Sequence, residues 1–256
     1  MSIQSERQFE LFFSDPLYLL YKNHLYNYLV RRFVVLRNFR LRHSSERILE
    51  LGCGISPMLK TSFQAIRTDV SWRALAYLGD GRAVACDATQ LPFREDSVRS
   101  VVCSEVLEHI EKDEAVLDEI SRVLEPGGEL VLTLPMRPEL FGFDDFFVGH
   151  YRRYNFKKLA DSLSSRNFGE FQYRSLLGSL EKWIMERVTR FFSFLKKDAS
   201  SKRGEISVFG IRIFAWLFFP FYLLVNYLLA VFVYFQARFT PVSRAVTLFI
   251  RCRKNR

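Results

Sequence analysis

The stretch Arg47-Ile-Leu-Glu-Leu-Gly-Cys-Gly-Ile-Ser-Pro57 decides the fold of this chain. Residues 48–51 are mostly apolar and predict a short strand that is buried within a parallel sheet. Gly52 and Gly54 then indicate a tight turn, because glycine accepts positive φ and lets the backbone pass close to a ligand. A strand, a glycine turn and a following helix form a nucleotide-type cradle at the carboxyl edge of a sheet.

Further strands are predicted downstream of this turn. Asp69 ends a short apolar segment and lies 19 residues after Glu50, a spacing that suits an acidic residue binding ribose hydroxyls. Apolar runs predict three more strands, at 83–85, 98–103 and 129–134. A helix is predicted over 113–124, with Pro126-Gly127-Gly128 as its stop signal. Alternating strands and helices predict an α/β fold with a doubly wound parallel sheet.

Four segments in this order resemble the class I S-adenosylmethionine-dependent methyltransferases, in particular the type 11-like branch with small-molecule and lipid-pathway members. They are Leu-Glu-Leu-Gly-Cys-Gly (49–54), Cys-Asp-Ala-Thr-Gln-Leu-Pro-Phe (86–93), the stretch 97–110 containing Ser-Glu-Val-Leu-Glu-His, and 123–135 containing Glu-Pro-Gly-Gly-Glu. The resemblance covers roughly residues 46–180. It implies a Rossmann-like, seven-stranded α/β sheet, S-adenosylmethionine as the cofactor and direct transfer of its methyl group.

The resemblance also implies the cofactor-binding residues. They are Glu50, Gly52, Cys53, Gly54, Asp69, Asp87, Ala88, Ser104 and Glu105. Glu50 would hold the glycine loop and the amino end of the methionine moiety, and Asp69 would bind the ribose. Two alternatives follow from the residues themselves: Glu50 pairs with Arg47, or Asp69 only caps a helix that starts at Val70 or Ser71.

The remaining cofactor residues follow later strands. Asp87 and Ala88 would meet the adenine edge, and Ser104 and Glu105 would border the methionine and the methyl group. An ordinary turn is the alternative for Asp87-Ala88. The chain departs from the family pattern at Ser56, where the third glycine is expected.

The acceptor side is expected in the segment 141–156, which follows the fifth strand. His150 is a candidate general base, because an imidazole titrates near neutral pH. Tyr151 and His109 are further catalytic candidates, although His109 also suits a packing or capping role. Arg152 and Arg153 suit a phosphate or carboxylate. The alternative is a structural hinge before a helix over 156–163.

Cysteine spacing shows no metal-ligand pattern, and the sequence predicts no metal site. The four cysteines are Cys53, Cys86, Cys103 and Cys252. We interpret them as buried, reduced thiols of a cytosolic protein. The polar start of the chain, Met1 to Glu10, does not resemble a signal peptide.

Charge and hydropathy divide the chain into four parts. Residues 1–45 carry a net charge of +4 and are predicted as an amphipathic helical segment, chiefly over 16–39. Residues 46–179, the predicted cofactor-binding core, carry −5. Residues 180–256 carry +10; they divide into a basic, apolar helical insert at 180–240 and a closing strand with a basic tail at 241–256.

The insert suggests contact with a membrane surface. Residues 206–235 contain one charge, Arg212, and are long enough for a transmembrane helix. Pro220 argues against a single span, and residues 245–252 look like the closing strand of the methyltransferase sheet, which favours a re-entrant or interfacial hairpin of two short helices. A two-span hairpin or a single anchor is the alternative. The preceding stretch, 180–197, has the pattern of a basic amphipathic helix, with Trp183 on its apolar face and Lys182 on its basic face.

The sequence hypothesis is therefore a methyltransferase acting on an amphipathic or lipid-linked acceptor, as a peripheral or monotopic protein on the cytoplasmic face of a membrane. The alternatives are a soluble small-molecule methyltransferase with a helical cap, and a non-catalytic membrane-bound scaffold. A nucleic-acid substrate is disfavoured because the basic residues are interleaved with apolar ones. No oligomeric state is predicted.

Overall fold

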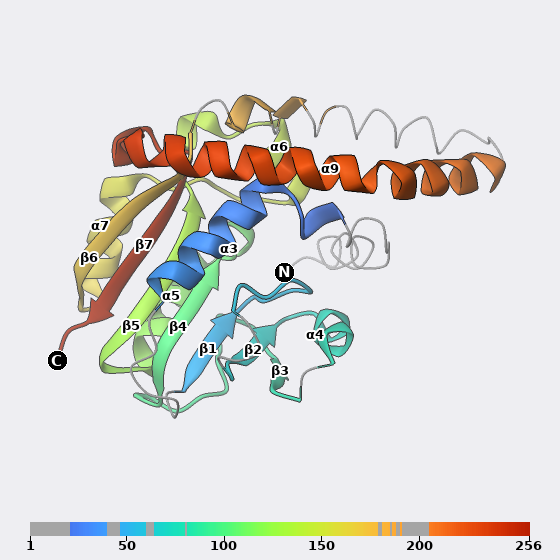
Figure 1. Cartoon of the computed structure of the whole chain (residues 1–256). Helices are drawn as coiled ribbons and strands as arrows, with labels where there is room; N and C mark the ends of the chain where they lie inside the picture. The colour runs from blue at the N-terminus through green and yellow to red at the C-terminus, as the bar shows by residue number, and fades with distance from the viewer. Residues whose placement is uncertain are drawn as a thin grey trace.

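A seven-stranded sheet forms the centre of the structure, in the order β3-β2-β1-β4-β5-β7-β6 (Figure 1). This computed structural model describes residues 21–39, 47–59, 64–79, 81–178, 181–184, 186–187, 190 and 205–256, and only the helical backbone of 205–217. The strands are β1 (Ile48–Leu51), β2 (Ile66–Asp69), β3 (Ala83–Ala85), β4 (Val98–Ser104), β5 (Leu124–Pro135), β6 (Phe168–Leu177) and β7 (Thr247–Lys254). Strands β1 to β5 pair in parallel, whereas β7 runs antiparallel to both β5 and β6. The predicted α/β sheet and its closing antiparallel strand are confirmed.

Helices cover both faces of this sheet. They are α3 (Tyr26–Asn38), α4 (Trp72–Leu78), α5 (Asp113–Val123), α6 (Phe143–Val148), α7 (Phe156–Ser165) and α9 (Glu205–Phe239), with 3-10 turns η2 (Leu107–His109), η3 (Pro138–Leu140) and η4 (Val242–Arg244). Successive strand residues point to opposite faces. Leu49 accordingly packs in the core with α5 and α7, while its neighbour Ile48 packs in the core with α3 and α9. The sheet is doubly wound, as predicted.

The structure refines two predictions around the glycines. Residues 52–59 contain no helix, and 60–63 lie outside the described residues. The predicted helix over 113–124 is confirmed as α5, which ends at Val123, but the Pro-Gly-Gly segment lies inside β5, at a bulge where the register shifts between Val98 and Ser100 of β4. Gly128 fits there because a Cβ would lie 2.7 Å from the carbonyl oxygen of Glu125. Close backbone packing, rather than a helix stop, accounts for that glycine.

Helix α9 replaces the predicted hairpin of two short helices. It is one helix of 35 residues with Pro220 inside it. A proline removes one backbone hydrogen bond and crowds the preceding turn, but here helical residues continue on both sides. Figure 1 shows α9 running along α3 and then well past it, toward its own N-terminal end. Its C-terminal part is anchored on the domain through buried Val233 and Ala237.

The two other predicted flanking helices are described in part. The prediction over 16–39 is confirmed for 26–38, which is α3, whereas 16–20 lie outside the described residues. Within 180–197, residues 181–184, 186–187 and 190 are helical and the others lie outside the description. The predicted polarity of this helix is wrong at Lys182. Trp183 is 57% exposed, whereas Lys182 is buried because its ammonium group pairs with Asp144 and Asp145.

Candidate functional site

A cavity of about 710 Å³ opens at the carboxyl ends of β1, β2 and β4. All nine predicted cofactor-binding residues line it, and so do His109, His150 and Tyr151. In an open α/β sheet, ligands bind at this edge. The fold thus brings the predicted residues from five separate segments of the chain to one cavity.

The glycine turn after β1 has the conformation that its sequence suggested. Gly52 has a φ of +62° and Gly54 a φ of +52°. A Cβ on Gly52 would lie 2.5 Å from Cγ2 of Val106, whereas a Cβ on Gly54 would meet nothing within 4 Å. Gly52 therefore meets two requirements, a left-handed backbone and close contact with the segment after β4.

Replacing Gly52 tests that distinction. We expect Gly52→Ala to lower the free energy of unfolding by about 2–4 kcal/mol, since left-handed strain and the contact with Val106 add up. Gly54→Ala introduces only the left-handed strain, so its free energy of unfolding should fall by about 1–2 kcal/mol. Urea denaturation followed by circular dichroism measures both. Equal losses in the two variants would contradict the role of the Val106 contact.

Glu50 holds the loop that follows the turn. Its carboxylate accepts hydrogen bonds from the backbone N–H groups of Met58 (2.5 Å) and Leu59 (3.3 Å). The side chain is buried, and burial raises its pKa to about 7, although the two hydrogen bonds act in the opposite direction. These two hydrogen bonds support the loop-holding role that the family resemblance implies for Glu50.

The raised pKa of Glu50 makes stability depend on pH. A carboxyl whose pKa is higher in the folded state binds its proton more tightly there, so its contribution is present below about pH 4.5 and is lost as the pH rises to about 7. We expect wild type, without cofactor, to lose on the order of 3 kcal/mol of stability relative to Glu50→Gln as the pH rises through this window. Urea denaturation at pH 4.5 and pH 7.5 measures it. Glu114→Gln, at an exposed carboxylate, serves as the control, and a pH-independent difference for Glu50→Gln would contradict the expectation.

Asp69 joins the glycine turn to the next helix. Its Oδ2 accepts from the N–H of Gly54 and its Oδ1 from the N–H of Ser71, both at 2.8 Å. Burial raises the pKa of this carboxyl. The N-cap of α4 is Ser71, whose hydroxyl accepts from the N–H of Ala74. The cap-only interpretation of Asp69 is therefore wrong.

The residues expected near the adenine form a compact turn. Oδ1 of Asp87 accepts from both the N–H and the hydroxyl of Thr89, each at 2.8 Å. Asp87 is exposed, and Ala88 is half-buried beside it. Asp87 and Ala88 therefore form an ordinary turn, as the alternative interpretation expected, and this turn also borders the cavity.

Ser104 ends β4 at the cavity wall, and Glu105 follows it. The Ser104 hydroxyl lies 2.7 Å from that of Thr133, and Glu105 adopts a φ of +54°. One carboxylate oxygen of Glu105 lies 3.2 Å from Nη1 of Arg31 in α3. The N-terminal helix thus contributes a charged group to the cavity.

The N-terminal segment contributes cavity residues that the site prediction did not select, among them Lys22, Tyr28 and Arg31. Burial and the charge of Arg31 lower the pKa of Lys22 to about 8, whereas Asp69 acts to raise it. The Tyr28 hydroxyl donates to the carbonyl oxygens of Ser56 or Pro57, at 3.2 and 3.3 Å. The run of cationic and aromatic residues in this segment was a sign of a functional role. The residues that these side chains contact come from distant parts of the chain and meet them only in the folded protein.

The acceptor-side candidates lie together at another wall of the cavity. The rings of His109 and His150 meet edge to face with centroids 4.6 Å apart. Burial and then the neighbouring His150 lower the pKa of His109 to about 3, so this imidazole is neutral. Tyr151 is 44% exposed, and its N–H donates to the carbonyl oxygen of Glu108 at 2.7 Å.

Asp145 of α6 orients His150 and was missed from the sequence. Its Oδ1 lies 2.8 Å from Nδ1 of His150, and Arg153 and Lys182 bind the same carboxylate at 2.7 and 2.9 Å. Burial raises the pKa of Asp145, but hydrogen bonds from His150, Arg153 and Lys182 outweigh it and hold the pKa below its usual range. The carboxylate is therefore a fixed anion behind the His150 ring.

The side chains of Arg152 and Arg153, next to His150, bind other groups of the protein. Arg153 is buried and paired with Asp145, while Arg152 binds Asp113 and the carbonyl oxygen of Glu111. These contacts favour the hinge interpretation over binding of a substrate anion. The predicted cap of the following helix is confirmed, since Oδ1 of Asn155 accepts from the N–H of Lys158.

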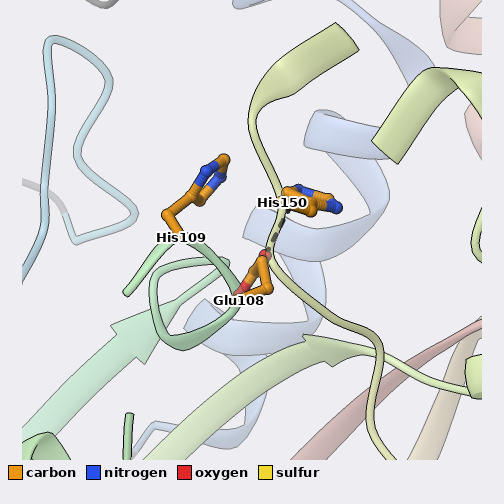
Figure 2. A group of neighbouring side chains, drawn as sticks. All are labelled: Glu108, His109 and His150. Carbon is orange, nitrogen blue, oxygen red and sulfur yellow. Dashed lines mark ion pairs between the residues drawn. The ribbon is translucent and has the colours of Figure 1, made fainter. Parts of the chain in front are cut away.

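Glu108 is a further residue that the sequence prediction did not select. It is fully buried, and within the described part of the chain neither carboxylate oxygen has a hydrogen-bond partner. Burial and the neighbouring Glu105 raise its pKa well above the usual value. Oε1 of Glu108 lies 3.8 Å from Nε2 of His150 (Figure 2). The sequence predicted no metal ligands, yet the fold gathers Glu108, His109 and His150 into a group that has metal-binding donors.

Comparisons with known proteins agree with this geometry. Residues 49–132 match the family model described as a methyltransferase domain. A demethylmenaquinone methyltransferase of Clavibacter sepedonicus is 35% identical over 102 residues, which cover 35% of this chain and 41% of that protein. An uncharacterised protein of Methanocaldococcus jannaschii is 30% identical over 109 residues, which cover 40% of this chain and 48% of that protein. The chain thus matches less than half the length of these two relatives.

Solved structures share the fold at low sequence identity. A Thermotoga maritima protein described as an S-adenosylmethionine-dependent methyltransferase, possibly acting on histamine, has a TM-score of 0.61 at 15% identity, with 97% of this chain and 99% of that chain covered. Phosphoethanolamine N-methyltransferase 2 of Haemonchus contortus, in complex with S-adenosylmethionine, has a TM-score of 0.56 at 17% identity, with 88% and 52% covered. The strand order and the glycine turn agree with this likeness: residues 49–132 are similar to a methyltransferase domain, and the chain shares the fold of these solved structures.

Proposed function

We propose that this protein is an S-adenosylmethionine-dependent methyltransferase that acts on an amphipathic or lipid-linked acceptor at a membrane surface. The observation that carries the catalytic part is the cavity that all nine predicted cofactor-binding residues line. S-adenosylmethionine supplies an activated methyl group when bound. The protein orients the two reactants and excludes water.

The geometry suggests a role for each wall of the cavity. Glu50 and the turn at 52–54 would support the methionine end of the cofactor, and Asp69 would bind the ribose. Asp87 and Ala88 would meet the adenine, whereas Ser104 and Glu105 would border the methionine and the methyl group. These assignments rest on the positions of the residues around the cavity and on the family resemblance.

The acceptor would approach the wall formed by His109, His150 and Tyr151. His150 suits contact with the acceptor, because Asp145 binds its Nδ1 and leaves Nε2 on the other side of the ring. A base in this position would serve a hydroxyl acceptor, whereas a carbon or nitrogen acceptor has less need of one.

Helix α9 supports the membrane part of the proposal. Its stretch Phe218–Phe239 is, by length and composition, able to cross a membrane, and 17% of its most apolar stretch is buried. Exposed apolar side chains along it include Phe221, Leu224, Leu228, Val231, Phe232, Phe235 and Phe239. So much exposed apolar surface on one helix is typical of contact with lipid or a partner. Basic residues of the C-terminal part would favour anionic headgroups on the cytoplasmic face.

The names of the relatives agree with an apolar acceptor. Demethylmenaquinone, after which the Clavibacter enzyme is named, is a quinone, and such a molecule fits the proposed class of amphipathic acceptor. A soluble enzyme with α9 as a helical cap is less favoured, because the outer face of α9 is exposed. A scaffold without catalysis is less favoured, because the cavity at the glycine turn is open and lined by carboxylates.

Calorimetry with S-adenosylmethionine and S-adenosylhomocysteine tests the catalytic part. The full chain, purified in detergent, is expected to bind both with dissociation constants in the micromolar range. Liposome methylation assays with quinone-type acceptors would then identify the substrate. Absence of binding to folded protein would reject the enzyme and favour the scaffold.

A further inference from the structure

The cluster formed by Glu108, His109 and His150 has the composition of a metal centre. Glu108 and His109 come from η2, directly after β4, and His150 comes from the segment after α6. One potential ligand atom from each residue lies within 4.8 Å of the other two. Figure 2 shows the Glu108 carboxylate below the two imidazole rings, linked to His150 by the contact of 3.8 Å.

The buried Glu108 carboxylate is the strongest sign of a missing partner. Buried polar groups are nearly always hydrogen-bonded, and an unpaired buried charge is strongly unfavourable. Both oxygens of Glu108 lack a hydrogen-bond partner within the described part of the chain, and the residue is 0% exposed. A cation held between this carboxylate and the imidazoles would supply that partner.

His150 is already arranged as a metal ligand. The carboxylate of Asp145 binds Nδ1 of His150 at 2.8 Å, which fixes the ring and leaves Nε2 toward Glu108. Metal-binding histidines usually have their second nitrogen bound to a carboxylate or carbonyl in this way. Asp145 is in turn held by Arg153 and Lys182, so the support behind the ring is itself rigid.

We propose that Glu108, His109 and His150 bind one divalent transition-metal ion, with Zn²⁺ the best match to two nitrogens and one oxygen. Three protein ligands leave a fourth position for water or a substrate oxygen, as in catalytic zinc sites. Bonds of about 2.0–2.2 Å require the ligand atoms to approach by roughly an ångström, which side-chain rotation about the existing contacts allows. His109 and His150 both line the cavity, so the open position faces its interior.

This site does not rest on the proposed methyl transfer, since its ligands are distinct from the nine cofactor-binding residues. If both proposals hold, the metal would bind an acceptor oxygen and lower its pKa, in place of a histidine base. If the protein failed to bind the cofactor, the proposal of a metal site would be unaffected. If it failed to bind metal, the proposed methyl transfer would be unaffected.

The test is metal binding by the full-length protein after treatment with a chelator. Zn²⁺ is titrated in competition with a chromophoric chelator, and Co²⁺ is added separately for its visible absorption. We expect one equivalent to bind with a dissociation constant in the micromolar range or below. Glu108→Gln, His109→Gln and His150→Gln should each weaken binding by about 100-fold or more.

Matched controls separate this site from general affinity for metals. Glu114→Gln changes an exposed carboxylate, and His24→Gln changes a histidine outside the cavity lining, so both should bind Zn²⁺ like the wild type. Circular dichroism and S-adenosylhomocysteine binding report whether each variant folds. If Glu108→Gln does not fold, His150→Gln decides the question. Zn²⁺ binding that is absent in the wild type, or unchanged in folded variants, would overturn the proposal.

Discussion

Asp69→Ala is expected to weaken binding of S-adenosylmethionine and S-adenosylhomocysteine by at least about 100-fold. The carboxylate fixes the N–H groups of Gly54 and Ser71 and has lone pairs left for the ribose hydroxyls. Hydrogen bonds to a charged group contribute about 1.5–3 kcal/mol each. Asp69→Ala would lose those to the ribose and also those that order the glycine turn, which together account for a loss in affinity of at least about 100-fold. Isothermal calorimetry measures it for both ligands.

The control for this prediction is Asp118→Ala. Asp118 is also paired, with Arg166, but its side chain is 65% exposed and it does not line the cavity. Its variant should bind both ligands like the wild type. Unchanged affinity in folded Asp69→Ala would mean that the ribose binds elsewhere.

The second large effect is expected on membrane binding. A triple variant, Phe221→Ser with Leu224→Ser and Leu228→Ser, removes three side chains that are 66%, 58% and 63% exposed. Insertion of each apolar side chain contributes about 1.5–3 kcal/mol. We expect the affinity for liposomes to fall by about 100-fold or more. Flotation with phosphatidylglycerol-containing vesicles, compared with zwitterionic ones, measures both this loss and the contribution of the basic residues.

The matched control removes exposed apolar side chains elsewhere. Trp72→Ser with Tyr77→Ser changes residues of α4 that are 68% and 65% exposed. This variant should float with vesicles like the wild type. The anchoring contacts of α9 at Val233 and Ala237 are untouched in the triple variant, so its domain should stay folded. If wild-type protein did not bind vesicles of either composition, the membrane proposal would be rejected.

Local patterns account for the predictions that hold. The apolar run at 48–51 and the glycines after it predicted β1 and its turn, because burial and positive φ restrict the choice of residue at each position. Asp69 was identified by its spacing from Glu50, since the length of one βα unit fixes the distance between successive strand ends. The return to the sheet at β7 was implied by the family resemblance.

The errors arise where distant parts of the chain decide the outcome. Pro220 is a poor residue for a helix, yet α9 continues through it, with its C-terminal part packed on α3 and β6. Lys182 was assigned to a solvated face, but two carboxylates of α6 neutralise its charge and allow its burial. Propensity is a local quantity, and in both cases tertiary context overrides it.

The sequence by itself determined the sheet, the glycine turn and the edge at which a cofactor would bind, because these follow from periodicity and backbone stereochemistry within short segments. Only the tertiary structure brought His150 to Glu108, which lies 42 positions earlier in the chain. Only it showed that Asp145 supports that imidazole and that Glu108 has no hydrogen-bond partner among the described residues. Such contacts depend on how the segments after β4 and β5 pack together, and spacing along the chain does not encode them.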